Sequence, residues 1–246
     1  MRFPPLPPVI KNLLIVNGLI WLVMAISPSI DDTFSRLLGL HYISSPGFNP
    51  AQLFTHMFLH GGLTHLFFNM FALVMFGGVI ERSMGSARFL GYYITCGLVA
   101  ALVQMGAYAV AINHYVNMLG MTPADVALLE EQGWELIRTG YNYVGDIGEL
   151  NALINGTMVG ASGAIYGVLL AFGMLFPNAP VYIFFIPYPV KAKWLVIGYG
   201  VLELVQGLGG VADNVAHFAH LGGMIGGIIL IIWWKRKGVF RNGWFF

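Results

Sequence analysis

Six apolar segments constrain this chain more than any other feature, because each is long enough, at about 20 residues, to cross a lipid bilayer. They lie near residues 9–27, 64–82, 87–112, 153–176, 190–207 and 214–234. Only 9% of the residues are charged, whereas soluble domains average about 25%. We therefore expect an all-α polytopic membrane protein in which residues 1–246 form a single domain of six transmembrane helices in the lipid bilayer.

Two further features of the composition narrow the alternatives. The net charge of +1 gives no indication of a nucleic-acid partner, and the single cysteine, Cys96, cannot form an internal disulfide.

The first apolar segment also has features of a signal peptide, because Arg2 and Lys11 precede a short apolar core and small residues follow it. We favour a retained helix, since the chain after this segment stays as apolar as the segment itself.

The distribution of cationic residues predicts an orientation. If the N-terminus is cytoplasmic, six spans place the C-terminus there too, and only Arg36 and Arg138 fall outside. The other ten of the twelve Lys and Arg residues are then inside: Arg2, Lys11, Arg82, Arg88, Lys191, Lys193, Lys235, Arg236, Lys237 and Arg241. This asymmetry follows the positive-inside rule. We expect an integral protein of a bacterial inner membrane, because the chain is compact and shows no transit peptide.

A long polar excursion, residues 113–152, separates the third and fourth apolar segments. Within it, Val126, Leu129, Trp134 and Ile137 recur at helical spacing. This pattern predicts a helix lying at the outer membrane interface, with Trp134 at the depth that aromatic rings favour. A functional loop, a partner-binding element and a spacer all fit such a segment.

A serine among glycines marks the fourth apolar segment. Ser162 stands between Gly160 and Gly163. Polar side chains inside membrane helices usually face the protein interior or a wet cavity, but small residues at this spacing are also typical of simple helix packing. The pattern is not the G-x-S-x-G elbow of soluble hydrolases, because position 164 is alanine.

Two histidines, His217 and His220, stand at the outer end of the sixth segment. His220 shares a helix face with Gly223 and Gly227, and such a face can approach a helix of small residues. Ser162 lies at a comparable depth, so it can form a nucleophile–base pair with His220. We expect His217 nearly one turn further out, as a partly solvated or hydrogen-bonded residue at the helix end.

Other polar groups occur in the second and fifth segments. His65 and Asn69 share a face at i, i+4 and can both donate hydrogen bonds, either to an oxyanion or to a neighbouring helix. We interpret His56 and His60 as loop-anchoring or cavity-lining residues. Glu203 is the only acid well inside an expected span, and we favour a structural role for it.

Taken together, these residues resemble the rhomboid family of intramembrane serine proteases. The resemblance rests on four motifs: H-x-x-x-N at 65–69, G-x-S-G at 160–163, A-H-x-x-G-x-x-x-G at 219–227 and E-R-x-x-G at 81–85. Their order and placement are more specific than any one motif. The resemblance implies a six-helix rhomboid-like bundle that cleaves transmembrane segments of other proteins near the outer face, with no metal or cofactor.

The resemblance also implies a role for each motif residue. Ser162 would be the nucleophile and His220 the general base, while His65, Asn69 and the backbone N–H of Ser162 would line the oxyanion hole. Tyr166 matches a family tyrosine that packs against the catalytic histidine. The supporting residues are then Gly160, Gly163, Tyr166, Gly223 and Gly227.

No acid stands where it would obviously orient His220. Asp213 is near the outer boundary and Glu203 belongs to another expected helix. We therefore expect a Ser–His dyad rather than a triad, with residues 206–214 as a glycine-rich cap over the site.

Two features depart from the family pattern, and two other functions compete with proteolysis. The first outer loop, residues 28–55, lacks the Trp-Arg pair of many members, and the loop at 113–152 is unusually long. A histidine-lined metal or proton transporter is one alternative, although the chain has no HExxH motif. A catalytically inactive rhomboid-like protein that binds membrane proteins is the other.

Overall fold

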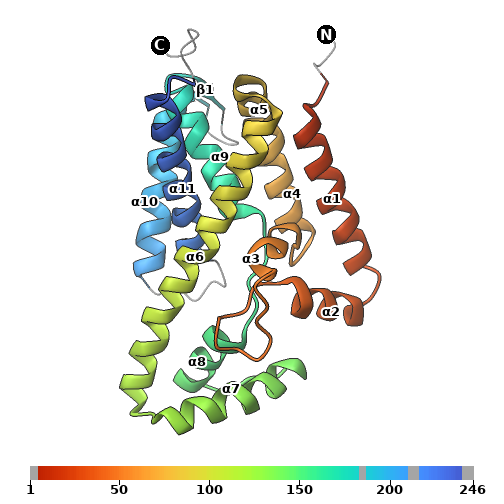
Figure 1. The fold of residues 1–246 in the computed structure, drawn as a ribbon, viewed down its shortest axis with the longest axis vertical. Coiled ribbons are helices and arrows are strands. Elements are labelled where there is room, and N and C mark those ends of the chain that lie inside the picture. Colours follow the sequence, from red (N-terminus) through yellow and green to blue (C-terminus); the bar gives the residue numbers. More distant parts are fainter. Residues whose placement is uncertain (1–4, 183–186, 210–215, 240–246) are drawn as a thin grey trace.

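The computed structural model describes residues 5–182, 187–209 and 216–239, and within these ranges the chain is mostly helical (Figure 1). The helices form an elongated bundle. The start of α1 (Pro8–Met24) and the end of α11 (His217–Arg236) lie at one end of it, and α7 (Pro123–Arg138) and α8 (Asp146–Asn155) lie at the other.

Three helices of the described chain are long and apolar enough to cross a membrane. One is continuous from Leu63 to Met84 and consists of α4 (Leu63–Ala72), a π-helical turn η2 (Leu73–Gly77) and α5 (Gly78–Met84). The others are α6 (Ser86–Leu119) and α11. The remaining predicted spans contain the shorter helices α1, α9 (Ser162–Leu175) and α10 (Ala192–Leu208).

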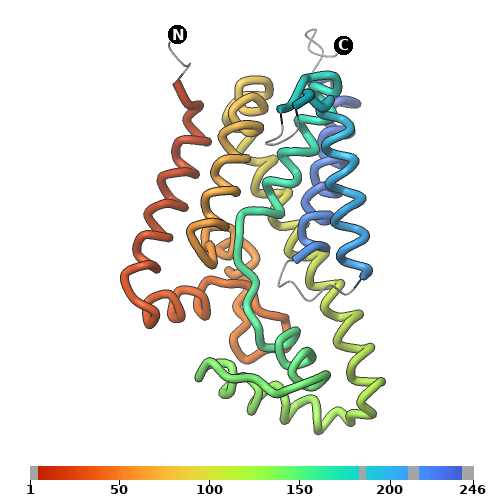
Figure 2. The backbone as a smooth tube through the Cα atoms, turned by 180° about the vertical axis from the view of Figure 1, so that it is seen from behind, coloured from red at the N-terminus to blue at the C-terminus, as the bar shows by residue number. Residues whose placement is uncertain are grey.

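The predicted span over 153–176 is wrong in its first part. Helix α8 ends at Asn155, and a non-helical segment leads to α9, which begins only at Ser162. In this segment Gly160 has a φ of +133°, which L side chains rarely adopt. A Cβ at Gly160 would also lie 2.9 Å from the ring of His65. Figure 2 shows this segment rising from the α7–α8 end of the molecule into the bundle.

Helix α6 continues beyond the predicted span 87–112 and carries the chain away from the bundle. Its 34 residues correspond to about 51 Å at 1.5 Å per residue, which exceeds the roughly 30 Å of a bilayer core. The final residues of α6 pack with α7 and α8 around Leu129, Leu150 and Ile154. Much of the predicted polar excursion at 113–152 is therefore a small helical subdomain.

The chain between α1 and the Leu63–Met84 helix is anchored by this subdomain. It contains α2 (Pro28–Leu38), α3 (Gln52–Thr55) and a short 3-10 turn, η1 (His56–Phe58). Trp134 of α7 packs edge-on against the buried ring of His41 at 5.2 Å and lies against Gly47. Trp134, which was expected at the membrane interface, thus packs against other residues of the protein. Its contacts with His41 and Gly47 anchor the segment 28–55, which has no Trp-Arg pair.

The E-R-x-x-G motif holds the first helix. Glu81 is buried, and its two carboxylate oxygens accept hydrogen bonds from the backbone N–H groups of Val9 and Ile10 at 3.0 and 2.9 Å. These are first-turn donors of α1 that have no partner within their own helix. Gly85 follows at a φ of +84°, which allows the sharp turn into α6.

The core of the bundle is formed where α6, α9 and α11 meet, and α10 packs on α9 and α11 from the outside. One feature departs from the expected all-helical fold. Strands β1 (Pro180–Val181) and β2 (Val190–Lys191) pair antiparallel between α9 and α10. This hairpin is only two residues long on each side, so the fold remains essentially a helical bundle.

Candidate active site

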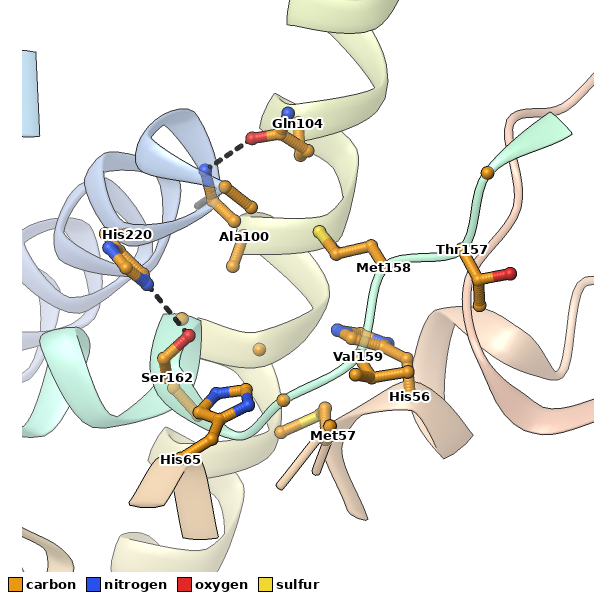
Figure 3. A pocket seen from close by; sticks show the side chains of 18 of the residues that line it. His56, Met57, His65, Ala100, Gln104, Thr157, Met158, Val159, Ser162 and His220 are labelled. Carbon is orange, nitrogen blue, oxygen red and sulfur yellow. Dashed lines mark hydrogen bonds between the residues drawn. The ribbon is translucent and has the colours of Figure 1, made fainter. Parts of the chain in front are cut away.

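The structure brings Ser162 and His220 together inside the bundle. Ser162 is the first residue of α9, and His220 lies in the first turn of α11. Nε2 of His220 is 2.8 Å from Oγ of Ser162, and the two side chains point toward each other in Figure 3. This is hydrogen-bonding distance for a nucleophile and its base.

Glycines at the α9–α11 crossing allow this approach. A Cβ at Gly223 would overlap the carbonyl oxygen of Gly163, and one at Gly227 would overlap the hydroxyl of Tyr92. A Cβ at Gly163 would overlap the side chain of Ala100 on α6. Because none of these glycines carries a side chain, the helix backbones approach closely enough for His220 to reach Ser162.

Tyr166 and Glu203 complete the surroundings of His220. The ring of Tyr166 stacks on the ring of His220 with centroids 4.1 Å apart and planes 6° from parallel. The hydroxyl of Tyr166 donates a hydrogen bond to Oε1 of Glu203 on α10. Oε2 of Glu203 lies 3.0 Å from Nδ1 of His220, on the ring edge opposite Ser162.

The expectation that no acid approaches His220 is therefore wrong. Glu203 is 4% exposed, and α10 turns this one carboxylate inward while most of its other residues face outward. For His217 the hydrogen-bonded alternative holds, because its side chain is 6% exposed and its Nδ1 lies 2.6 Å from Oε2 of Glu203. The sequence showed Glu203 to be the only acid well inside an expected span, but its neighbours across α9 and α11 depend on how α10 is rotated.

His65 and Asn69 lie on α4, on the other side of Ser162. The ring of His65 lies beside Ser162 in Figure 3, and it is close enough to Gly160 that a Cβ there would lie 2.9 Å from it. Asn69 is buried, and its Nδ2 has no hydrogen-bond partner in the part of the chain that the structure describes. Buried amide donors are normally paired, so Asn69 offers a donor to a bound group.

A cavity of about 920 Å³ joins these side chains. Ser162, His220, His65 and Asn69 line one part of it. The segment 156–160 and residues of α8 line another part, so the helical subdomain forms a wall of the site. Residues 210–215 of the expected cap, including Asp213, lie outside the described residues.

His56 lines this cavity, and the ring of His60 packs edge-on against the ring of His65 at 5.0 Å. Both are buried, and burial lowers the pKa of His56 to about 4 and that of His60 to about 3. His56 donates from Nδ1 to the carbonyl of Gln52 at 2.8 Å, and its own carbonyl accepts from the N–H of Gly160. His56 thus anchors the segment that leads to Ser162.

One group of side chains has the donor set of a metal site. Potential ligand atoms of Glu203, His217 and His220 all lie within 4.8 Å of one another. Two imidazoles and a carboxylate suit several transition metals. Here the same atoms make contacts among themselves, and Nε2 of His220 is turned to Ser162.

Comparisons with known proteins give a consistent result. A family model described as "Rhomboid domain" matches residues 48–237. RHOMBOID-like protein 12, mitochondrial, from Arabidopsis thaliana is 30% identical and covers 77% of this chain. Rhomboid protein 1, mitochondrial, from Saccharomyces cerevisiae is 26% identical over 82% of the chain. Rhomboid protease GluP from Bacillus subtilis is 24% identical over 72%.

The shares of the relatives that are matched are smaller. They amount to 47% of the Arabidopsis protein, 46% of the yeast protein and 24% of GluP. The chain thus spans about half the length of the first two relatives.

Proposed function

Because this chain belongs to the rhomboid family, we propose that it is a serine endopeptidase that cleaves transmembrane segments of other membrane proteins. The observation that carries the proposal is the 2.8 Å contact between Ser162 Oγ and His220 Nε2 beside a cavity. The protein is an integral membrane protein, as its family and its three long apolar helices indicate.

The first chemical step is attack by the serine. The Oγ–H proton of Ser162 passes to Nε2 of His220 while Oγ forms a bond to the carbonyl carbon of the substrate. The carbonyl oxygen becomes an oxyanion. Nδ2 of Asn69, a ring N–H of His65 and the backbone N–H of Ser162 are the donors proposed to stabilise it. Ser162 begins α9, so the positive end of the helix dipole adds to this stabilisation.

The intermediate then collapses to an acyl-enzyme. The C–N bond of the substrate breaks, and the proton on Nε2 of His220 goes to the leaving amine. Water, activated by His220 in the same way, hydrolyses the ester and restores the Ser162 hydroxyl. The cavity beside the two side chains gives space for both the scissile peptide and this water.

The proposed membrane arrangement extends the fold. We infer that α1, the Leu63–Met84 helix, α6, α9, α10 and α11 cross the bilayer as one domain. The termini are then cytoplasmic, and α7 and α8 lie outside, in agreement with the positive-inside distribution. Cleavage would occur near the outer face, because Ser162 begins α9 at the end nearer the α7–α8 subdomain. The bacterial inner membrane stays a prediction that the comparisons do not support, because the relatives include mitochondrial proteins as well as a bacterial one.

The direct test is cleavage of a single-spanning model substrate in vesicles that contain the purified protein. Ser162→Ala and His220→Ala are the matched variants, and we expect both to lose cleavage. Equal cleavage by all three proteins would overturn the proposal. No cleavage by the wild type, together with retained substrate binding, would instead favour the inactive binding protein. Wild-type transport of Zn²⁺ or protons without cleavage would favour the transporter.

A further inference from the structure

The proposed protease leaves one buried carboxylate without a function. Glu203 is the only residue of α10 whose charged side chain is buried among α9 and α11. Three side chains that can donate hydrogen bonds surround it: Tyr166, His217 and His220. A carboxylate accepts at about four positions and donates at none when ionised. The surroundings therefore fit an ionised Glu203.

We propose that Glu203 is a positioning residue for His220, so that the site works as a Ser162–His220–Glu203 triad. This inference deepens the proposed protease function and rests on it. The carboxylate approaches Nδ1 of His220 at 3.0 Å, while Nε2 of the same ring faces Ser162 at 2.8 Å.

The first effect of the contact between Glu203 and His220 is to select the tautomer of the His220 ring. To accept the Ser162 proton, Nε2 must be unprotonated, so the single ring proton must reside on Nδ1. The opposite tautomer would place the lone pair of Nδ1 3.0 Å from a buried carboxylate, which is repulsive. Glu203 therefore favours the tautomer in which His220 acts as a base.

The second effect of the contact between Glu203 and His220 is to stabilise the positive charge that develops on His220 during the reaction. When Nε2 takes the serine proton, His220 becomes an imidazolium whose Nδ1 proton stays in place, and Glu203 remains ionised beside it. Attraction over 3.0 Å in a site where Glu203 is 4% exposed is far stronger than in water. Nδ1 of His220 makes no hydrogen bond of good geometry with a described residue. The carboxylate therefore acts through its charge, and alignment can improve when substrate binds.

The remaining contacts hold the carboxylate and the ring in register. His217 is one turn before His220 on α11, and its Nδ1 lies 2.6 Å from the same oxygen of Glu203. Tyr166 binds the other oxygen and stacks on the His220 ring. Among the residues that the structure describes, the titratable groups around His220 are Glu203 from α10, Tyr166 from α9, His217 on its own helix and His65 of α4 across the cavity.

The test is the pH profile of kcat for Glu203→Gln, measured on a model transmembrane substrate in vesicles. Glutamine keeps the size of the side chain but removes its charge. We expect kcat to fall by about 10²–10⁴-fold, KM to change little, and the acid limb of the profile to move to lower pH, because imidazolium formation loses its counter-charge. Glu203→Asp, which keeps the charge but shortens the side chain, should restore part of kcat and the position of the acid limb.

Glu81→Gln is the matched control, because Glu81 is a buried carboxylate whose hydrogen bonds within the described chain go to the start of α1 and to Ser86. It should lower the melting temperature without moving the acid limb. A Glu203→Gln enzyme with wild-type kcat and an unmoved limb would overturn the positioning role. So would a variant that loses stability and activity together while keeping the limb, since that is a structural role. Absence of cleavage by the wild type would instead contradict the proteolytic function itself.

Discussion

Gly223 lies directly against Gly163, so that a Cβ atom on Gly223 would overlap the carbonyl oxygen of Gly163. The obstacle is backbone, which cannot rotate away as a side chain can. Gly223 is one turn after His220 on α11, and Gly163 follows Ser162 on α9. The spacing between these two helices therefore determines whether the proposed base reaches the proposed nucleophile.

Gly223→Ala should separate α9 from α11 and move His220 away from Ser162. Since a misplacement of about 1 Å can cost roughly 10²-fold in rate, we expect a loss of cleavage of that order and a lower melting temperature. Gly106→Ala on α6 is the matched control, because nothing lies within 4 Å of a Cβ there. Wild-type cleavage by Gly223→Ala would show that the close approach is not required.

Asn69→Ala should lower kcat by about 10²–10³-fold with little change in KM, because the amide is proposed to bind an oxyanion that exists only during the reaction. The control is Asn17→Ala, which removes another buried asparagine, whose Nδ2 donates to the carbonyl of Leu13 within α1. This control should affect stability alone. A rise in KM at constant kcat for Asn69→Ala would contradict the oxyanion role.

Two substitutions of Tyr166 separate its ring from its hydroxyl. Tyr166→Phe keeps the ring that stacks on His220 and removes only the donor to Glu203, so we expect a fall in kcat of less than about tenfold. Tyr166→Ala removes both contacts and should lower kcat by about 10²-fold. The measurement is the steady-state kcat of the two variants. An equal loss of kcat in both would contradict a separate contribution from ring stacking.

Stability should fall in acid because of His56. Burial lowers its pKa to about 4 from an ordinary value near 6.5, so the unfolded chain binds a proton more readily than the folded protein. Above about pH 6.5 the His56 ring is neutral in both states, and the folded protein keeps its full stability. As the pH falls toward 4, the unfolded chain gains a proton that the folded protein does not bind, and the free energy of unfolding decreases by about 3 kcal/mol. His56→Gln should flatten the decline in melting temperature over this range. An unchanged slope would show that His56 is not responsible.

The parts of the site that lie along one helix were predictable from the sequence. Helical spacing placed His220, Gly223 and Gly227 on one face, and the structure turns that face toward α9. The same reasoning put His65 and Asn69 on one face of α4. Their comparable depth allowed Ser162 and His220 to pair across two helices, and the family motifs then assigned that pairing, which spacing within one helix does not contain.

The contacts that depend on helix rotation were not predictable. Glu203 lies in an apolar helix with no strong polar face, so its sequence neighbours do not indicate which side is buried. The break between α8 and α9 was hidden for a similar reason, because residues 153–176 are predominantly apolar while the requirement at Gly160 comes from the distant His65 ring. The last part of α6, residues 113–119, was predicted as loop because its polar residues are typical of one.

Covalent labelling with a fluorophosphonate measures the central claim most directly. An activated serine oxygen displaces fluoride from phosphorus, and the hydroxyl proton leaves through its base. Mass spectrometry of the membrane-reconstituted protein should find the adduct on Ser162 in the wild type and little or none in His220→Ala. Absence of an adduct on Ser162, or equal labelling of Ser162 in both proteins, would contradict the assignment of Ser162 as a nucleophile activated by His220.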